Sequence, residues 1–223
     1  MAGRKKKEFQ EYLSLDTNKT HISHEEYLQS PATAFLRYSV QAKDAVNNCI
    51  ENFNKNSDGS LNKQGRASLQ HILSAMLPAL MGHFETFQRH LFSGIFELST
   101  HIEKFDVHKF FKTLDKETSV KIDPINLSAY RGFTANVGIV IADNLQGWHD
   151  PEKVNKYFGA FDFKKQFYSK DDCKKLKVLW QLRHSIVHTG SSITLSDAQK
   201  IEELTKFGGK PINFEKNFIL EVS

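Results

Sequence analysis

Three side chains that could bind a phosphate and move protons lie close together in the chain: Arg183, His184 and His188. Histidine titrates near neutral pH and can act as an acid or a base, and a guanidinium pairs with phosphate oxygens through two parallel hydrogen bonds. The combination predicts a site that holds a phosphodiester and transfers protons around it. The two histidines are also one helical turn apart, a spacing that can supply two metal ligands. No nearby cluster of Cys, His and Asp completes a metal site, so we expect neither a metal nor a cofactor.

These residues lie on a predicted helix that begins near a cap at Ser169 or Asp171 and ends at Gly190. On a helical wheel, Arg183 falls within about 20° of the middle of an apolar arc about 160° wide. An arginine is rarely buried without a partner, so this position indicates a carboxylate, carbonyl groups or a bound phosphate nearby. The arc contains Leu176, Leu179, Trp180, Leu182, Ile186 and Val187.

Arg183 and His188 are about 140° apart on the same wheel. They meet at one phosphate if the helix loosens near Gly190, if the side chains bend together, or if a second copy of the chain contributes. We favour a two-fold pairing of these helices. The alternative without a ligand is that Arg183 pairs with Glu85 or with helix-end carbonyls, while His188 caps the helix and complements its dipole. Glu85 on its own is more simply an exposed glutamate on a helix surface.

The segment from Arg183 to His188 resembles the signature of HEPN domains, which are all-helical modules that process nucleic acids. An apolar run precedes it, Thr189 and Gly190 follow it, and a long aromatic-rich helix lies far upstream. The resemblance covers roughly residues 65–207. It implies a metal-independent endoribonuclease of a defence, toxin or RNA-processing system, acting as a homodimer with a composite active site. Some HEPN domains only bind, so a non-catalytic module for RNA or for a protein partner such as an antitoxin stays open.

In the catalytic reading, the neighbouring ribose 2′-OH attacks the phosphate. Arg183 binds the scissile phosphate, and His188 takes the hydroxyl proton or protonates the leaving 5′-oxygen. His184 positions either Arg183 or His188.

The composition is that of one globular domain: 223 residues, 39% hydrophobic and 25% charged. A net charge of +4 permits an RNA substrate without demanding one. We expect Cys49 and Cys173 to be reduced thiols in a cytoplasmic protein, since no signal peptide precedes them. No apolar run approaches the ~20 residues of a membrane span.

The periodicity predicts an all-α, HEPN-like up-and-down helical bundle with an extra N-terminal helix and a short extended C-terminal tail. Residues 1–30 form an N-terminal extension in which Ser23 and Glu26 are spaced as a capping box, residues 31–207 form the single domain, and residues 208–223 form the tail. We predict one helix from Pro31 to about Asn54 and a second from Gly65 to Phe105, with a kink or break at Pro78. A short helix lies within 106–126, and another runs from Leu127 to about Leu145. The remaining helices are one that begins after a cap at Asp150, the helix that carries Arg183, and one that begins after a cap at Ser196 or Asp197. The aromatic segment 157–163 is more readily a lid over the core than a surface for stacking bases.

Overall fold

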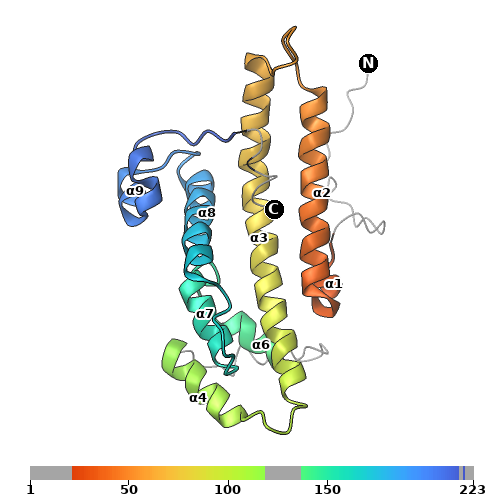
Figure 1. Ribbon diagram of the computed structural model, residues 1–223, viewed down its shortest axis with the longest axis vertical. Helices are drawn as coiled ribbons and strands as arrows, with labels where there is room; N and C mark the ends of the chain where they lie inside the picture. Colours follow the sequence, from red (N-terminus) through yellow and green to blue (C-terminus); the bar gives the residue numbers. More distant parts are fainter. Residues whose placement is uncertain (1–21, 119–136, 216–217, 219–223) are drawn as a thin grey trace, which may run out of the picture.

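The computed structural model describes residues 22–118, 137–215 and 218, and these ranges fold as an all-α bundle (Figure 1). Their regular structure is helical apart from two isolated bridges, Lys55 with Leu61 and Ser192 with Pro211. The elements in chain order are α1 (His24–Gln29), α2 (Pro31–Asn52), α3 (Lys63–Ser99), α4 (Val107–Thr118), α6 (Val137–Asn144), α7 (Pro151–Gly159), α8 (Lys170–His188), α9 (Leu195–Lys200) and the 3-10 helix η2 (Glu202–Phe207).

A long hairpin of α2 and α3 is the scaffold on which the other helices pack (Figure 1). Pro31 is in the first turn of α2, where its missing N–H leaves no bond unmade, and Asn62 caps α3 by accepting from the Gly65 N–H at 2.9 Å. The helix continues through Pro78, so the predicted break does not occur. Leu77 and Leu80 on either side are fully buried, and their burial offsets the one backbone bond that the proline removes.

Two hydrophobic clusters divide the core along α3. The cluster toward the start of α3 joins α2, α8 and the α9–η2 segment, and it includes Leu73, Leu77 and Leu182. α8 packs against α3 here, which ties the predicted site helix to the scaffold.

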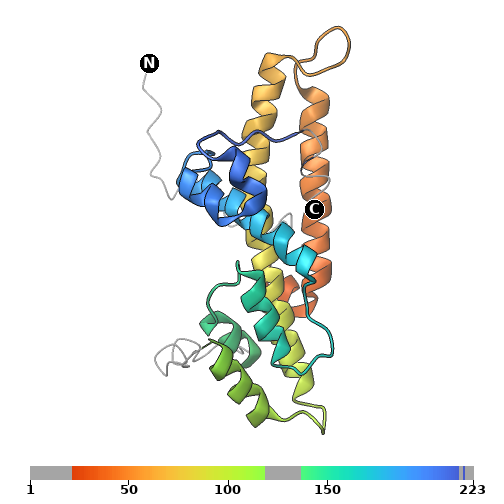
Figure 2. The ribbon, with the colours of Figure 1, turned by 60° about the vertical axis from the view of Figure 1, so that its left-hand side comes forward.

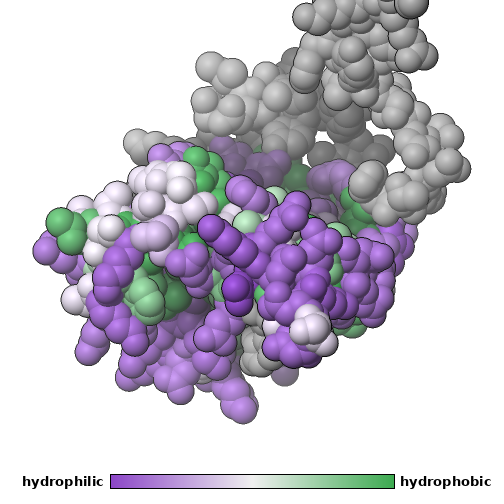
Figure 3. Space-filling view, turned by 90° about the horizontal axis from the view of Figure 1, so that it is seen from above, coloured by the Kyte–Doolittle hydropathy of each residue, from purple (hydrophilic) through white to green (hydrophobic). Residues whose placement is uncertain are grey.

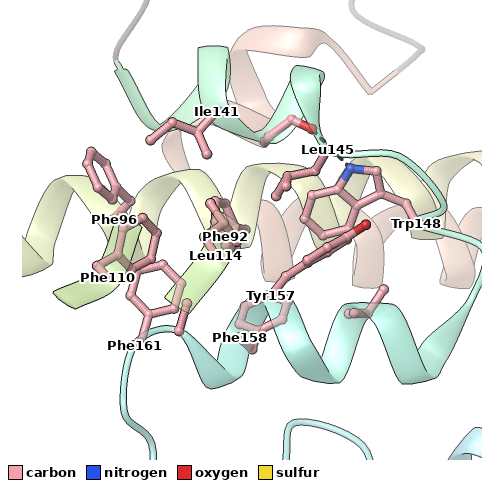
Figure 4. Packing of buried hydrophobic residues seen from close by; sticks show 13 residues of the cluster. Phe92, Phe96, Phe110, Leu114, Ile141, Leu145, Trp148, Tyr157, Phe158 and Phe161 are labelled. Carbon is pink, nitrogen blue, oxygen red and sulfur yellow. Dashed lines mark hydrogen bonds between the residues drawn. The ribbon is translucent and has the colours of Figure 1, made fainter. Parts of the chain in front are cut away.

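The second cluster joins the end of α3 to α4, α6 and α7 and is mostly aromatic (Figure 4). Tyr157, Phe158 and Phe161 are buried in it, in agreement with the predicted lid over the core, whereas Phe163 of the same aromatic segment is 50% exposed. Gly138 lets α6 approach α3 closely, because a Cβ there would lie 2.5 Å from the Ser93 carbonyl oxygen.

Both ends of the described chain are attached to the hairpin. Ser23 caps α1 by accepting from the Glu26 N–H at 3.2 Å, as predicted, and Tyr27 is buried with its hydroxyl 2.9 Å from Nδ1 of His83. After η2, the backbone of the buried Phe214 forms two hydrogen bonds with the Gln70 side chain. The Gln70 Nε2 donates to the Phe214 carbonyl at 2.6 Å, and the Phe214 N–H donates to Gln70 Oε1 at 2.7 Å. The tail is thereby fixed to α3, 144 residues away in sequence.

Residues 211–215 have no helix, in agreement with an extended tail, whereas Phe218 is helical, and the other residues after 215 lie outside the described residues. So does the first part of the helix predicted from Leu127, of which Val137–Asn144 is described. Cys49 and Cys173 are free thiols. Among the described helices, none combines the length and the apolar character needed to cross a membrane.

Candidate active site at the end of α8

Local capping sets both ends of α8, as the sequence predicts. Ser169, rather than Asp171, is the N-cap: its hydroxyl accepts from the Asp172 N–H at 3.1 Å, and the Asp172 carboxylate accepts from the Ser169 N–H at 3.2 Å. At the other end, the Thr189 N–H donates to the Ser185 carbonyl at 3.0 Å, and Gly190 turns the chain with φ of +61°. The helix therefore ends directly after His188.

Arg183 is partly buried, and its Nε is a buried donor without an acceptor. Among the described residues, the guanidinium forms no ion pair with any carboxylate. Glu85 is not its partner: it binds Arg89 one turn further along α3 at 2.6 Å, and Arg89 also reaches Asp143 at 3.5 Å. The structure thus contradicts the alternative in which Glu85 satisfies Arg183, because a closer cation on the same helix already occupies that carboxylate.

His184 and His188 are exposed and form a pair one turn apart on α8. Their ring centroids are 4.7 Å apart with the ring planes at 42°. His188 is the last residue of the helix, where the C-terminal end of the helix dipole favours a cation. From above, hydrophilic side chains cover most of the described surface, with smaller hydrophobic patches among them (Figure 3). The imidazole pair is accessible to a polar ligand.

A carboxylate that the sequence did not single out for the site, that of Asp197 on α9, has an electrostatic interaction with His184. Asp197 is 6% exposed, and hydrogen bonds from Lys200 and Thr194, both at 2.9 Å, lower the pKa of its carboxyl group; His184 adds a smaller attraction in the same direction. The true cap of α9 is Thr194, which accepts from the Asp197 N–H at 3.0 Å, so the predicted cap at Ser196 or Asp197 was wrong. The available signal was the Thr194-x-x-Asp197 spacing, a capping-box pattern.

The connection between α8 and α9 is held by backbone hydrogen bonds to the tail. The Ile193 N–H donates to the Lys210 carbonyl at 3.0 Å, and the Gly209 N–H donates to the Ile193 carbonyl at 2.8 Å. The Ile212 N–H donates to the Ser191 carbonyl at 2.7 Å. These bonds place α9 beside the end of α8 (Figure 2). The position of α9 beside the end of α8 therefore depends on a contact with a distant part of the chain.

A metal at this end would need a third ligand besides the two histidines. Within the described ranges, no group of three or more His, Cys, Asp and Glu side chains is arranged to hold a metal ion. The groups that can act on a ligand here are the Arg183 guanidinium and the two imidazoles.

An all-α bundle with an arginine and a histidine five residues apart at the end of one packed helix has the architecture and the motif of a HEPN domain. Residues 39–210 match the model of the RiboL-PSP-HEPN family, so the chain belongs to this family. The match runs from within α2 past η2 and includes the whole site. No curated protein and no solved structure matches the chain.

Proposed function

We propose that the protein is a metal-independent endoribonuclease that cuts RNA by attack of the ribose 2′-OH. The observation that carries the proposal is the Arg183 guanidinium, which has no ion-pair partner among the described residues, beside the exposed pair of His184 and His188 in a chain of the HEPN family. A buried donor without an acceptor is unfavourable in the free protein, and a phosphate oxygen is the acceptor that a guanidinium binds best. HEPN domains often bind RNA and dimerise.

In the proposed reaction, the 2′-oxygen forms a bond to phosphorus while the bond from phosphorus to the 5′-oxygen breaks. The products are a 2′,3′-cyclic phosphate and a 5′-hydroxyl. His188 takes the 2′-hydroxyl proton or supplies the proton of the leaving oxygen, and Arg183 stabilises the charge on the phosphate oxygens. His184 is a positioning residue, and it attracts the Asp197 carboxylate electrostatically.

A second copy of the chain is part of this proposal, because Arg183 and His188 point about 140° apart on α8. The apolar arc around Arg183 supports it: Leu176, Leu179 and Ile186 are only partly buried, and Val187 is 49% exposed. Pairing two such helices would bury this apolar surface and bring Arg183 of one copy toward the histidines of the other.

The test is incubation of the pure protein with total RNA in the presence of EDTA, followed by mapping of the cut ends. We expect cyclic-phosphate ends on RNA and no cleavage of DNA, which lacks the 2′-OH. His188→Ala should lower the rate about 10²- to 10⁴-fold, the usual contribution of a general acid or base. A His188→Ala protein that cuts as fast as the parent, both with EDTA, contradicts the assignment.

We further propose that the activity serves in the cytoplasm as a toxin or defence effector. Expression should then slow growth, and Arg183→Ala should relieve the effect. A protein that binds RNA but neither cuts it nor harms cells would instead be a non-catalytic HEPN module.

A further inference from the structure

A hollow of about 570 Å³ lies between α7 and α8, at the end of α8 opposite to the histidine pair. Figure 2 shows the course of the two helices. Four lysines line it against one carboxylate: Lys156, Lys170, Lys174 and Lys177, with Glu152. Glu152 hydrogen-bonds to Lys177. Lys170 and Lys174 are exposed, and among the described residues neither has an ion-pair partner. The hollow therefore holds an excess of positive charge.

The lysines of α8 lie on the same helix face as the histidines. On a helical wheel with about 100° per residue, six residues of α8 lie within about 40° of the direction of Lys170. We call them the α8 stripe: Lys170, Lys174, Lys177, Gln181, His184 and His188. Its members are exposed or partly exposed.

The acidic residues of α8 do not interrupt the stripe. Asp171 and Asp172 lie about 100° and 200° from Lys170 on the wheel, and the Asp172 carboxylate is bound in the capping box with Ser169. The stripe thus offers cationic, amide and imidazole groups in one line, and none of its members is a carboxylate.

We propose that the α8 stripe and the lysine hollow form the track of the RNA backbone, with the cut at the histidine end and the phosphates on one side of it bound by Lys170 and Lys174. The proposal rests on the proposed function, since it assigns how the substrate of that site is held. A polyanion is the ligand whose charge matches a line of lysines in which Lys170 and Lys174 have no ion-pair partner among the described residues. From Lys170 to His188 the helix rises about 27 Å, the length of about eight nucleotides of a stacked strand at 3.4 Å each.

Salt dependence of binding measures this contact directly. Each phosphate neutralised on a single strand changes the slope of log K against log salt by about −0.7. Removing both lysines with Lys170→Gln and Lys174→Gln should therefore make the slope less steep by about 1.4, and Lys174→Gln alone by about 0.7. The matched control is Lys112→Gln with Lys116→Gln, two exposed lysines with the same four-residue spacing on α4.

The experiment uses fluorescence anisotropy of a labelled, unstructured 12-nucleotide RNA, with EDTA present and all variants in the full-length His188→Ala protein so that the RNA stays intact. We expect the parent slope in the α4 control and a reduced slope in the α8 variants. Equal slopes in all proteins, or no binding of RNA by any of them, would overturn the track.

The two proposals fail in different ways. If the parent protein cuts RNA while the α8 lysine variants keep the full salt slope, the track is wrong and the nuclease stands. If the slope falls as expected but the parent protein leaves RNA intact, the nuclease is wrong and the track stands.

Discussion

Replacing Arg183 with methionine should stabilise the free protein while removing its activity. The guanidinium Nε is buried and has no acceptor in the described structure, so folding removes its water without replacing the hydrogen bond. A buried donor in this state costs about 1–3 kcal/mol. Methionine keeps an unbranched stem against the apolar arc and carries no donor. We therefore expect Arg183→Met to raise the free energy of unfolding by about 1 kcal/mol or more.

For a chain of this length, 1 kcal/mol shifts Tm by about 2–4 °C. The assay is thermal unfolding followed by circular dichroism at low protein concentration, so that any second copy is dissociated. Arg89→Met is the matched control: that guanidinium is 31% exposed and bound to Glu85 at 2.6 Å, so its loss should leave Tm unchanged or slightly lower. A fall in Tm of the Arg183→Met protein to that of Arg89→Met or below would refute the claim that Arg183 is unsatisfied.

The same variant should lose RNA cleavage, because methionine cannot bind the scissile phosphate. Higher stability with lower activity is the pattern expected of a residue kept for its ligand. A variant that is both less stable and fully active would show that Arg183 is a structural arginine.

Three further predictions concern the scaffold. Gln70→Ala removes both hydrogen bonds to the buried backbone of Phe214 and should lower the free energy of unfolding by about 1–3 kcal/mol, measured by urea titration; an unchanged midpoint would show that the tail is not held there. Gly138→Ala should lower Tm because its Cβ has no room against α3, whereas Gly82→Ala, with open space around it, should raise Tm slightly; equal shifts would contradict the close packing. Burial lowers the pKa of His90, so the unfolded chain binds the proton more readily than the folded one. The free energy of unfolding should therefore fall as pH drops below about 6.5, by up to ~1.4 kcal/mol per pH unit. His90→Leu should flatten this pH dependence, and an equally steep profile in the variant would contradict the prediction.

Features set by nearby residues could be read from the sequence. The ends of α8 follow from a capping box at Ser169 and from Gly190, and the start of α2 follows from Pro31. Each depends on atoms within a few residues of one another, so the pattern suffices. The partial burial of Arg183 was predictable in the same way, because the helical period places it within the apolar arc.

Features set by competition between distant groups were not predictable. The sequence predicted a kink or a break at Pro78, but α3 continues through it, and burial on both sides outweighs one lost backbone bond. The partner of Glu85 depended on whether Arg89 or Arg183 came closer. The electrostatic attraction between Asp197 and His184 was missed because the sequence around Asp197 suggested only a helix cap.

The sequence by itself determined the helical class and the limits of the site helix, since both follow from periodicity and local hydrogen bonding. It also supplied the residue types of the proposed phosphate-binding motif. Only the tertiary structure decided that Arg183 has no carboxylate partner among the described residues, and that α9, which carries Asp197, is held beside the end of α8 by a turn bonded to the C-terminal tail. The physical reason is that electrostatic and hydrogen-bond partners are chosen by distances in space, and packing of α3, α8 and α9 sets those distances.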